Sequence, residues 1–172
     1  KENSFSKNQI LNRDYINAYD VQVGIGELTE ENAMRLREHG LTTSIVKLTI
    51  GYSKQTNHPG FSHQMTIEPT DSSKKLVNYM NRLFRKYYEP YPVRIINVTF
   101  HKIAPKQDYQ LSLFESTEDV LKDERLNKVV DLVRRKYGYT SLLHASSLIQ
   151  NGMAFQRSKL LGGHQANTEE NN

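Results

Sequence analysis

The sequence predicts an α+β domain with the element order β-α-β-β-α-β, two helices on one face of a sheet, and then a helical C-terminal extension. The first observation is the hydrophobic period, which switches between two and 3.6 residues in that order. The second is that each helical segment has one apolar stripe, which a single sheet face would bury. The third is a change of character after residue 103, where a proline-containing linker begins. The other sheet face is left for water or a ligand.

The first strand is expected within residues 6–16, and the first helix within residues 20–40. Thr29 is the expected N-cap of this helix, because two glutamates follow it in the first turn. The sequence leaves open whether the helix begins before Gly24 or restarts after Gly26. One helix face is mostly apolar and consists of Val21, Ile25, Leu28, Asn32 and Leu36.

A hairpin is expected next, with strands over residues 42–53 and 61–69 and turn residues over 54–60. One face of its first strand consists of Val46, Leu48, Ile50 and Tyr52. In its second strand, one alternating set is Phe61, His63, Met65 and Ile67, and the other is Ser62, Gln64 and Thr66.

The second helix is predicted within residues 70–92, where Pro90 and Pro92 end it. Its apolar stripe consists of Leu76, Met80, Leu83, Phe84 and Tyr87. The last strand is predicted over residues 93–103. It has Ile96, Val98 and Phe100 on one face and Ile95, Asn97, Thr99 and His101 on the other.

The extension is predicted to contain a helix over residues 117–138 and a shorter one over 139–152. The longer helix has an apolar stripe of Leu126, Val129, Val130, Val133 and Tyr137. Four carboxylates are assigned to its solvated face, namely Asp119, Asp123, Glu124 and Asp131. The expected division of the chain is 1–105 for the sheet domain, 106–115 for a linker, 116–150 for the helical extension and 151–172 for a flexible tail.

The composition favours an acidic partner, of which nucleic acid is the commonest, because the net charge is +4 and the pI is about 9.2. No apolar run approaches the roughly 20 residues that a membrane span needs. The absence of cysteine excludes disulfides and thiolate metal sites and is compatible with a cytoplasmic protein, which we expect. Because the sequence begins "KENSFSKNQ", without methionine, we expect an internal piece of a longer protein.

No catalytic or metal-binding site is expected in this chain. A two-metal site for phosphoryl transfer needs carboxylates that converge on ions roughly 4 Å apart, and the carboxylates here are dispersed. The six histidines lack metal-ligand spacing. The string "VGIGEL" lacks a preceding strand and a third glycine, so it is a poor phosphate-binding loop. An independent small enzyme is therefore the least favoured interpretation.

The open sheet face is more informative, because the predicted strands place several polar side chains on it. Lysines, hydroxyls and amides are the groups that contact phosphates in protein–DNA complexes. The same residues also suit an ordinary solvated face. An RNA-recognition motif is disfavoured, because its aromatic strand signature is missing and Phe100 is assigned to the core.

Several strings together resemble the little finger domain of Y-family, lesion-bypass DNA polymerases of the UmuC/DinB-like group from Gram-positive bacteria. They are "LTEENAMRLREHGLTTSIVKLTIGYSK", "GFSHQMTIEPT", "LFRKYY" and "YPVRIINVTFHKI". The string "YGYTSLLHASSLIQNGMAFQRSKLLGGHQ" is similar to the C-terminal extension of this subgroup. The resemblance implies DNA repair and damage tolerance, including the SOS response. The Mg²⁺-binding catalytic palm would lie upstream, with no cofactor in this chain.

The resemblance further implies that the sheet grips duplex DNA near the template–primer junction through phosphates. The candidate DNA contacts are Lys7, Asn8, Arg13, Lys47, Thr49, Lys54, Ser62, Gln64, Thr66, Asn97, Thr99 and His101. The alternative is an adaptor whose sheet does not touch DNA and whose C-terminal extension recruits a recombination or repair protein.

The string "DYQLSLFE" is similar to the pentapeptide by which bacterial polymerases dock on the sliding clamp. The resemblance implies that Gln110 enters a polar site, that Leu113 and Phe114 fill an apolar groove, that Leu111 packs beside them and that Ser112 faces outward. The alternative is that Leu113 and Phe114 staple the following helix to the domain.

Overall fold

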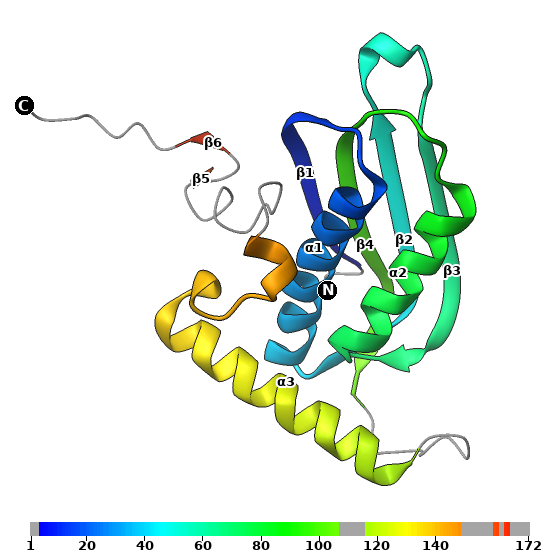
Figure 1. The fold of residues 1–172 in the computed structure, drawn as a ribbon. Helices are drawn as coiled ribbons and strands as arrows, with labels where there is room; N and C mark the ends of the chain where they lie inside the picture. The colour runs from blue at the N-terminus through cyan, green and yellow to red at the C-terminus, as the bar shows by residue number, and fades with distance from the viewer. Residues whose placement is uncertain (1–3, 107–115, 149–159, 162–163, 166–172) are drawn as a thin grey trace, which may run out of the picture.

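A computed structural model of the chain describes residues 4–106, 116–148, 160–161 and 164–165. The order β-α-β-β-α-β is confirmed, and the extension begins with a third long helix (Figure 1). The long elements are β1 (Ser4–Tyr15), α1 (Ala18–Glu38), β2 (Leu41–Tyr52), β3 (Phe61–Thr70), α2 (Ser73–Tyr87), β4 (Val93–Pro105) and α3 (Thr117–Tyr137). The short ones are η1 (Lys54–Thr56), η2 (Tyr139–Ser141), η3 (Ala145–Leu148), β5 (Leu160–Leu161) and β6 (His164–Gln165).

The four long strands form one sheet in the order β1-β4-β2-β3, and every neighbouring pair is antiparallel. Helices α1 and α2 lie side by side on one face of this sheet (Figure 1). The predicted arrangement of two helices on a single face is therefore confirmed.

The core lies between this face and the two helices. The fully buried side chains from α1 and α2 include Ile25, Leu36, Leu76 and Met80, all within the predicted stripes. They meet the predicted inner faces of the central strands, which consist of Val46, Leu48, Ile50, Ile96, Val98 and Phe100. Burying each such side chain contributes roughly 1.5–3 kcal/mol, so this layer dominates the stability of the domain.

Helix α1 is one continuous helix, and Thr29 is not its N-cap. The cap is Asn17, whose side chain accepts a hydrogen bond of 2.9 Å from the backbone N–H of Tyr19. Thr29 lies in the helix interior and donates its hydroxyl to the carbonyl oxygen of Ile25 over 2.6 Å. Gly24 and Gly26 each destabilise the helix by about 1 kcal/mol. Burial of the first turns of α1 against the sheet, including that of Val21, offsets this cost.

The docking face of α3 also differs from the expectation. Asp123, Glu124 and Asp131 were assigned to solvent, but they face the sheet domain and bind it. Asp131 pairs with Arg37, and Asp123 accepts the hydroxyl of Ser72 over 2.5 Å. Glu124 pairs with Lys106 over 2.7 Å. Of the four carboxylates, Asp119 is exposed as predicted.

The shorter segments also differ in part from the expectation. Two separate turns of 3-10 helix, η2 and η3, stand where one short helix was predicted. In the tail, which was expected to lack structure, β5 pairs with β6. Within the described ranges, no helix is both long and apolar enough to cross a membrane.

The β2–β3 hairpin depends on a glycine at its closing position. Gly60 has φ +83°, and a Cβ there would lie 2.1 Å from the carbonyl oxygen of Ile50. Gly60→Ala is therefore expected to lower the free energy of unfolding by about 2 kcal/mol, through backbone strain and displacement of the hairpin. Denaturant unfolding measures this loss. Gly40→Ala is the matched control, because Gly40 has φ +63° but open space around it. Equal losses for both variants would contradict the role of the close approach.

Candidate nucleic-acid interface

The face of the sheet opposite the helices, here called the open face, is built by the register of four strands. Side chains alternate between the two faces of a strand, so the residues paired with one another share a face. Three rows of paired residues cross the open face: Ser4–His101–Ile45–Thr66, Ser6–Thr99–Lys47–Gln64 and Asn8–Asn97–Thr49–Ser62. With neighbouring strands about 4.8 Å apart, each row spans about 14 Å.

The alternation of the central strands fixes which side chains reach this face. In β2, Val46 and Leu48 are fully buried beneath the helices, so Lys47 between them lies on the open face. In β4, Val98 and Phe100 are likewise buried and leave Thr99 on the open face. The hydrophobic core therefore holds the polar rows in place from below.

Hydrogen bonds between neighbouring strands orient several of these polar groups. The hydroxyl of Ser6 donates to Oδ1 of Asn97 over 2.9 Å and lies 3.0 Å from the hydroxyl of Thr99. On the other side of the face, the hydroxyls of Thr49 and Ser62 are 2.7 Å apart. A hydroxyl has one donor and two acceptor lone pairs, so these groups keep capacity for a further partner.

The electrostatics of the open face are set by Lys47. It is half-buried on an inner strand, between Thr99 and Gln64. No side chain in the three rows is acidic. Among the described residues, Lys47 has no ion pair with a carboxylate. The centre of the face therefore presents a positive charge that no neighbouring side chain neutralises.

Nine of the predicted DNA contacts lie together on this face. They are Asn8, Lys47, Thr49, Ser62, Gln64, Thr66, Asn97, Thr99 and His101. The prediction missed Ser4 and Ser6, which share the face with Asn8. The alternation of β1 could have identified both serines. Phe5 is buried opposite Phe100, so its neighbours Ser4 and Ser6 lie on the other face of the sheet.

The other three predicted contacts lie elsewhere. Lys7 lies on the helix side of the sheet: it pairs in register with Val98, and its ammonium is 2.9 Å from the carboxylate of Glu31. Arg13 is exposed in the irregular part of β1 between Ile10 and Tyr15. Lys54 is exposed at the start of η1, beyond the end of β2.

The five predicted clamp-binding residues, Gln110, Leu111, Ser112, Leu113 and Phe114, lie outside the described residues. The structure describes the residues on both sides of that segment. The backbone N–H of Lys106 donates to the carbonyl oxygen of Gly40 over 2.8 Å. Beyond the segment, Ser116 caps α3 by accepting a hydrogen bond from the backbone N–H of Asp119.

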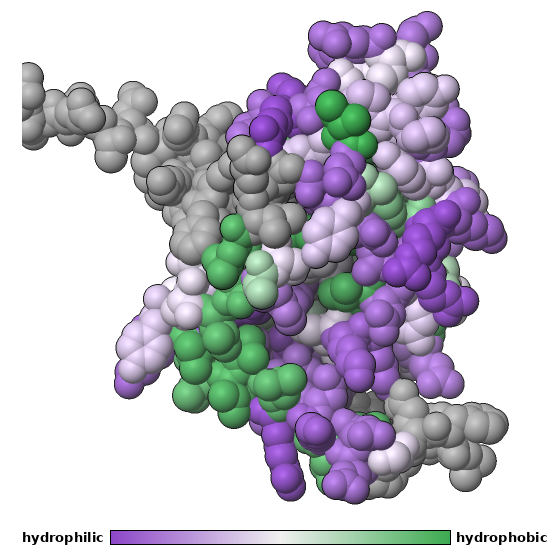
Figure 2. Space-filling model, viewed as in Figure 1, coloured by the Kyte–Doolittle hydropathy of each residue, from purple (hydrophilic) through white to green (hydrophobic). Residues whose placement is uncertain are grey.

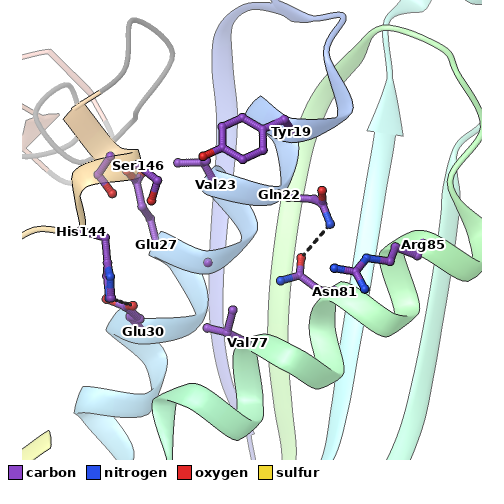
Figure 3. A pocket seen from close by; sticks show the side chains of 12 residues that line it. Tyr19, Gln22, Val23, Glu27, Glu30, Val77, Asn81, Arg85, His144 and Ser146 are labelled. Carbon is purple, nitrogen blue, oxygen red and sulfur yellow. Dashed lines mark hydrogen bonds and ion pairs between the residues drawn. The ribbon is translucent and has the colours of Figure 1, made fainter. Parts of the chain in front are cut away.

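A cavity of about 330 Å³ lies between α1, α2 and η3 (Figure 3). Gln22 donates to Asn81 across it over 3.4 Å, and Nε2 of His144 is 2.7 Å from Oε1 of Glu30. Nearby, burial raises the pKa of the Tyr139 hydroxyl, which keeps it neutral. The first contact joins α1 to α2, and the second joins the residue before η3 to α1. In the part of the chain that the structure describes, no three His, Cys, Asp or Glu side chains form a metal-binding group.

Known proteins share this sequence pattern. A family model described as the impB/mucB/samB family C-terminal domain matches residues 2–113. A Bacillus subtilis protein named for UV-damage repair, UvrX, is 38% identical over 164 residues, which are 95% of this chain and 39% of that protein. DNA polymerase IV 2 of B. subtilis is 31% identical over 156 residues, which are 90% of this chain and 37% of that protein. The chain thus spans about two fifths of the length of these curated relatives.

Solved structures include a complex of the beta-clamp processivity factor with the little finger domain of PolIV. That domain matches 65% of this chain over 99% of its own length, with a TM-score of 0.48 and 13% identity. The family model, by contrast, matches well over half of the 172 residues directly by sequence. The chain therefore belongs to the impB/mucB/samB family C-terminal domains, which are the little finger domains of Y-family DNA polymerases.

Proposed function

We propose that this chain is the DNA-gripping and clamp-docking portion of a translesion DNA polymerase that acts in DNA repair and damage tolerance. The observation that carries the proposal is the open face, whose polar rows contain Lys47 and no carboxylate. Family membership and the polymerase names of the relatives support the same function.

The open face suits phosphate contacts better than base readout. Phosphates accept hydrogen bonds from lysine, hydroxyl and amide groups, which are the groups of the three rows. The commonest specific base contact is arginine to guanine; no arginine lies in these rows, and Oδ1 of Asn97 already accepts a hydrogen bond from Ser6. A row about 14 Å wide matches the major groove, which is about 12 Å wide. The proposed grip therefore depends little on DNA sequence.

Polymerase chemistry is proposed for the parent protein and not for this chain. The chain spans 39% and 37% of the two relatives named above. We assign the Mg²⁺-binding carboxylates of the parent to the parts of those proteins that this chain does not match. In this division of labour, the present chain holds duplex DNA while the catalytic part extends the primer.

The affinity of the chain for primed duplex DNA is expected to fall steeply with salt and to change little with sequence. Each neutralised phosphate adds about 0.9 to the magnitude of the slope of log K against log salt. Fluorescence anisotropy of a labelled primed duplex at several salt concentrations measures this slope, with a second duplex of shuffled sequence as control. An affinity that does not change with salt, or that differs between the two sequences, would argue for the adaptor alternative.

The clamp contact is proposed from "QLSLF" at residues 110–114. Changing Gln110, Leu113 and Phe114 together to alanine is expected to abolish binding to a bacterial sliding clamp, because two large apolar anchors contribute roughly 3–6 kcal/mol before ordering costs. Surface plasmon resonance on immobilised clamp measures the loss. Ser112→Ala is the matched control and should bind like the unchanged chain. If the triple variant binds the clamp as tightly as the unchanged chain, and both still bind DNA, the clamp assignment is contradicted and the DNA-binding assignment is not.

A further inference from the structure

Helix α3 presents a row of large apolar side chains to solvent. Leu126 is 60% exposed, Val129 is 59% exposed and Leu132 is 67% exposed. Leu121 and Tyr137 extend the row toward the two ends of the helix. Figure 2 shows these apolar side chains gathered over α3 on the surface of the molecule. Such a contiguous apolar patch on a protein surface commonly marks an interaction site.

Polar contacts on the opposite side of α3 fix this orientation. Nε and Nη2 of Arg37 bind the two carboxylate oxygens of Asp131 over 2.6 and 2.9 Å. Arg134, which is buried, donates to Glu30 over 3.0 Å. At about 100° per residue, Asp131 and Arg134 lie on the side of the helix away from Val129. The helix is therefore held with its apolar row outward.

The charges around the apolar row are mainly positive. The exposed cations on this side of α3 are Lys122, Arg125, Lys128, Arg135 and Lys136, of which Lys122, Arg125 and Lys136 lie between residues of the apolar row. The flanking acids are Glu118 and Asp119, both in the first turn. A second copy of α3 would bring one basic rim against another. A partner with acidic flanks would instead meet complementary charge along most of the helix.

We propose that the outward face of α3 binds an acidic amphipathic helix of a partner protein. Leu126, Val129 and Leu132 supply the apolar contact, and the exposed cations among and beside them pair with glutamates or aspartates next to the partner's apolar stripe. Helix pairs of this kind use apolar anchors at helical spacing, and Leu126, Val129 and Leu132 follow one another at intervals of three residues. The surface is separate from the open face, so the chain can hold both ligands together.

The probe is a fluorescein-labelled synthetic peptide about 20 residues long, with leucines on one helical face and glutamates beside them. A second peptide has lysine in place of every glutamate. The full 172-residue chain is titrated into each, and anisotropy is recorded. The glutamate peptide should bind at least about tenfold more tightly than the lysine peptide. Equal affinities, or no binding of either, would overturn the proposal.

Two variants locate the contact. Leu132→Glu should weaken binding of the glutamate peptide at least about tenfold. Ile16→Glu is the control, since Ile16 is an 80% exposed apolar residue outside α3, and it should bind like the unchanged chain. Circular dichroism confirms that both variants are folded. Unchanged binding by Leu132→Glu would overturn the assignment to α3. Sedimentation that reveals a dimer lost in Leu132→Glu would also overturn it, by assigning the face to a second copy.

Discussion

Replacing Lys47 with glutamate is expected to weaken binding of primed duplex DNA roughly 50- to 100-fold at 0.1 M salt. One phosphate contact contributes a factor of about eight at this salt concentration, through release of about 0.9 counterion, and charge reversal doubles the effect on a logarithmic scale. Lys47 lies at the centre of the open face and has no ion pair among the described residues, so its charge is available to the DNA.

Anisotropy with the same primed duplex measures this loss. Lys47→Gln removes the charge without reversing it and should weaken binding about eightfold, with the salt slope reduced by about one. Lys74→Glu is the matched control, because Lys74 is exposed on α2, on the other side of the sheet. It should weaken binding only about twofold, through long-range repulsion. An equal loss for Lys74→Glu and Lys47→Glu would contradict a specific role for the open face.

Replacing Arg37 with alanine is expected to release α3 from the sheet domain. The guanidinium binds Asp131 through two hydrogen bonds, and it also donates to the carbonyl oxygen of Asp71 over 2.7 Å and to the hydroxyl of Ser73 over 3.0 Å. Without it, Asp131 would stay buried with no counter-charge, at a penalty of about 3–5 kcal/mol. Detachment of α3 avoids that penalty, because Asp131 then returns to water.

Hydrogen exchange read by mass spectrometry separates this detachment from global unfolding. Amides of α3 should exchange about 100-fold faster in Arg37→Ala, while those of β2 and β4 keep their protection. Arg135→Ala is the matched control, since Arg135 is exposed on α3, and it should leave exchange unchanged. Unchanged protection of α3 in Arg37→Ala would show that contacts other than this ion pair hold the helix.

The sheet and its two helices could be predicted because their side chains follow the hydrophobic pattern. Each central strand has one buried face, so alternation alone assigns Val46 to the core and Lys47 to the open face. Strand β1 has polar residues on both faces, and its phase is set by Phe5 opposite Phe100 across the sheet. Alternation alone therefore does not place Lys7, which the structure puts on the helix side of the sheet.

The placement of α3 could not be predicted from the same pattern. Its apolar stripe predicts a helix correctly, but a stripe normally marks the buried side. Here the buried side is defined by Asp131 and Arg134, whose partners Arg37 and Glu30 belong to α1. Ion pairs between residues so distant in sequence leave no periodic signal. Thr29 was misassigned for a similar reason, because packing of α1 on the sheet overrides the local capping signal.

The grip of the open face on duplex DNA is tested most directly by mapping backbone amide chemical shifts on the isotopically labelled 172-residue chain. Addition of primed duplex should shift the amides of Lys47, Thr99 and Gln64 most strongly, since they form the central row of the open face. The amides of α2 and α3 should change little. Large amide shifts confined to α2 and α3, with no change on the open face, would contradict the account.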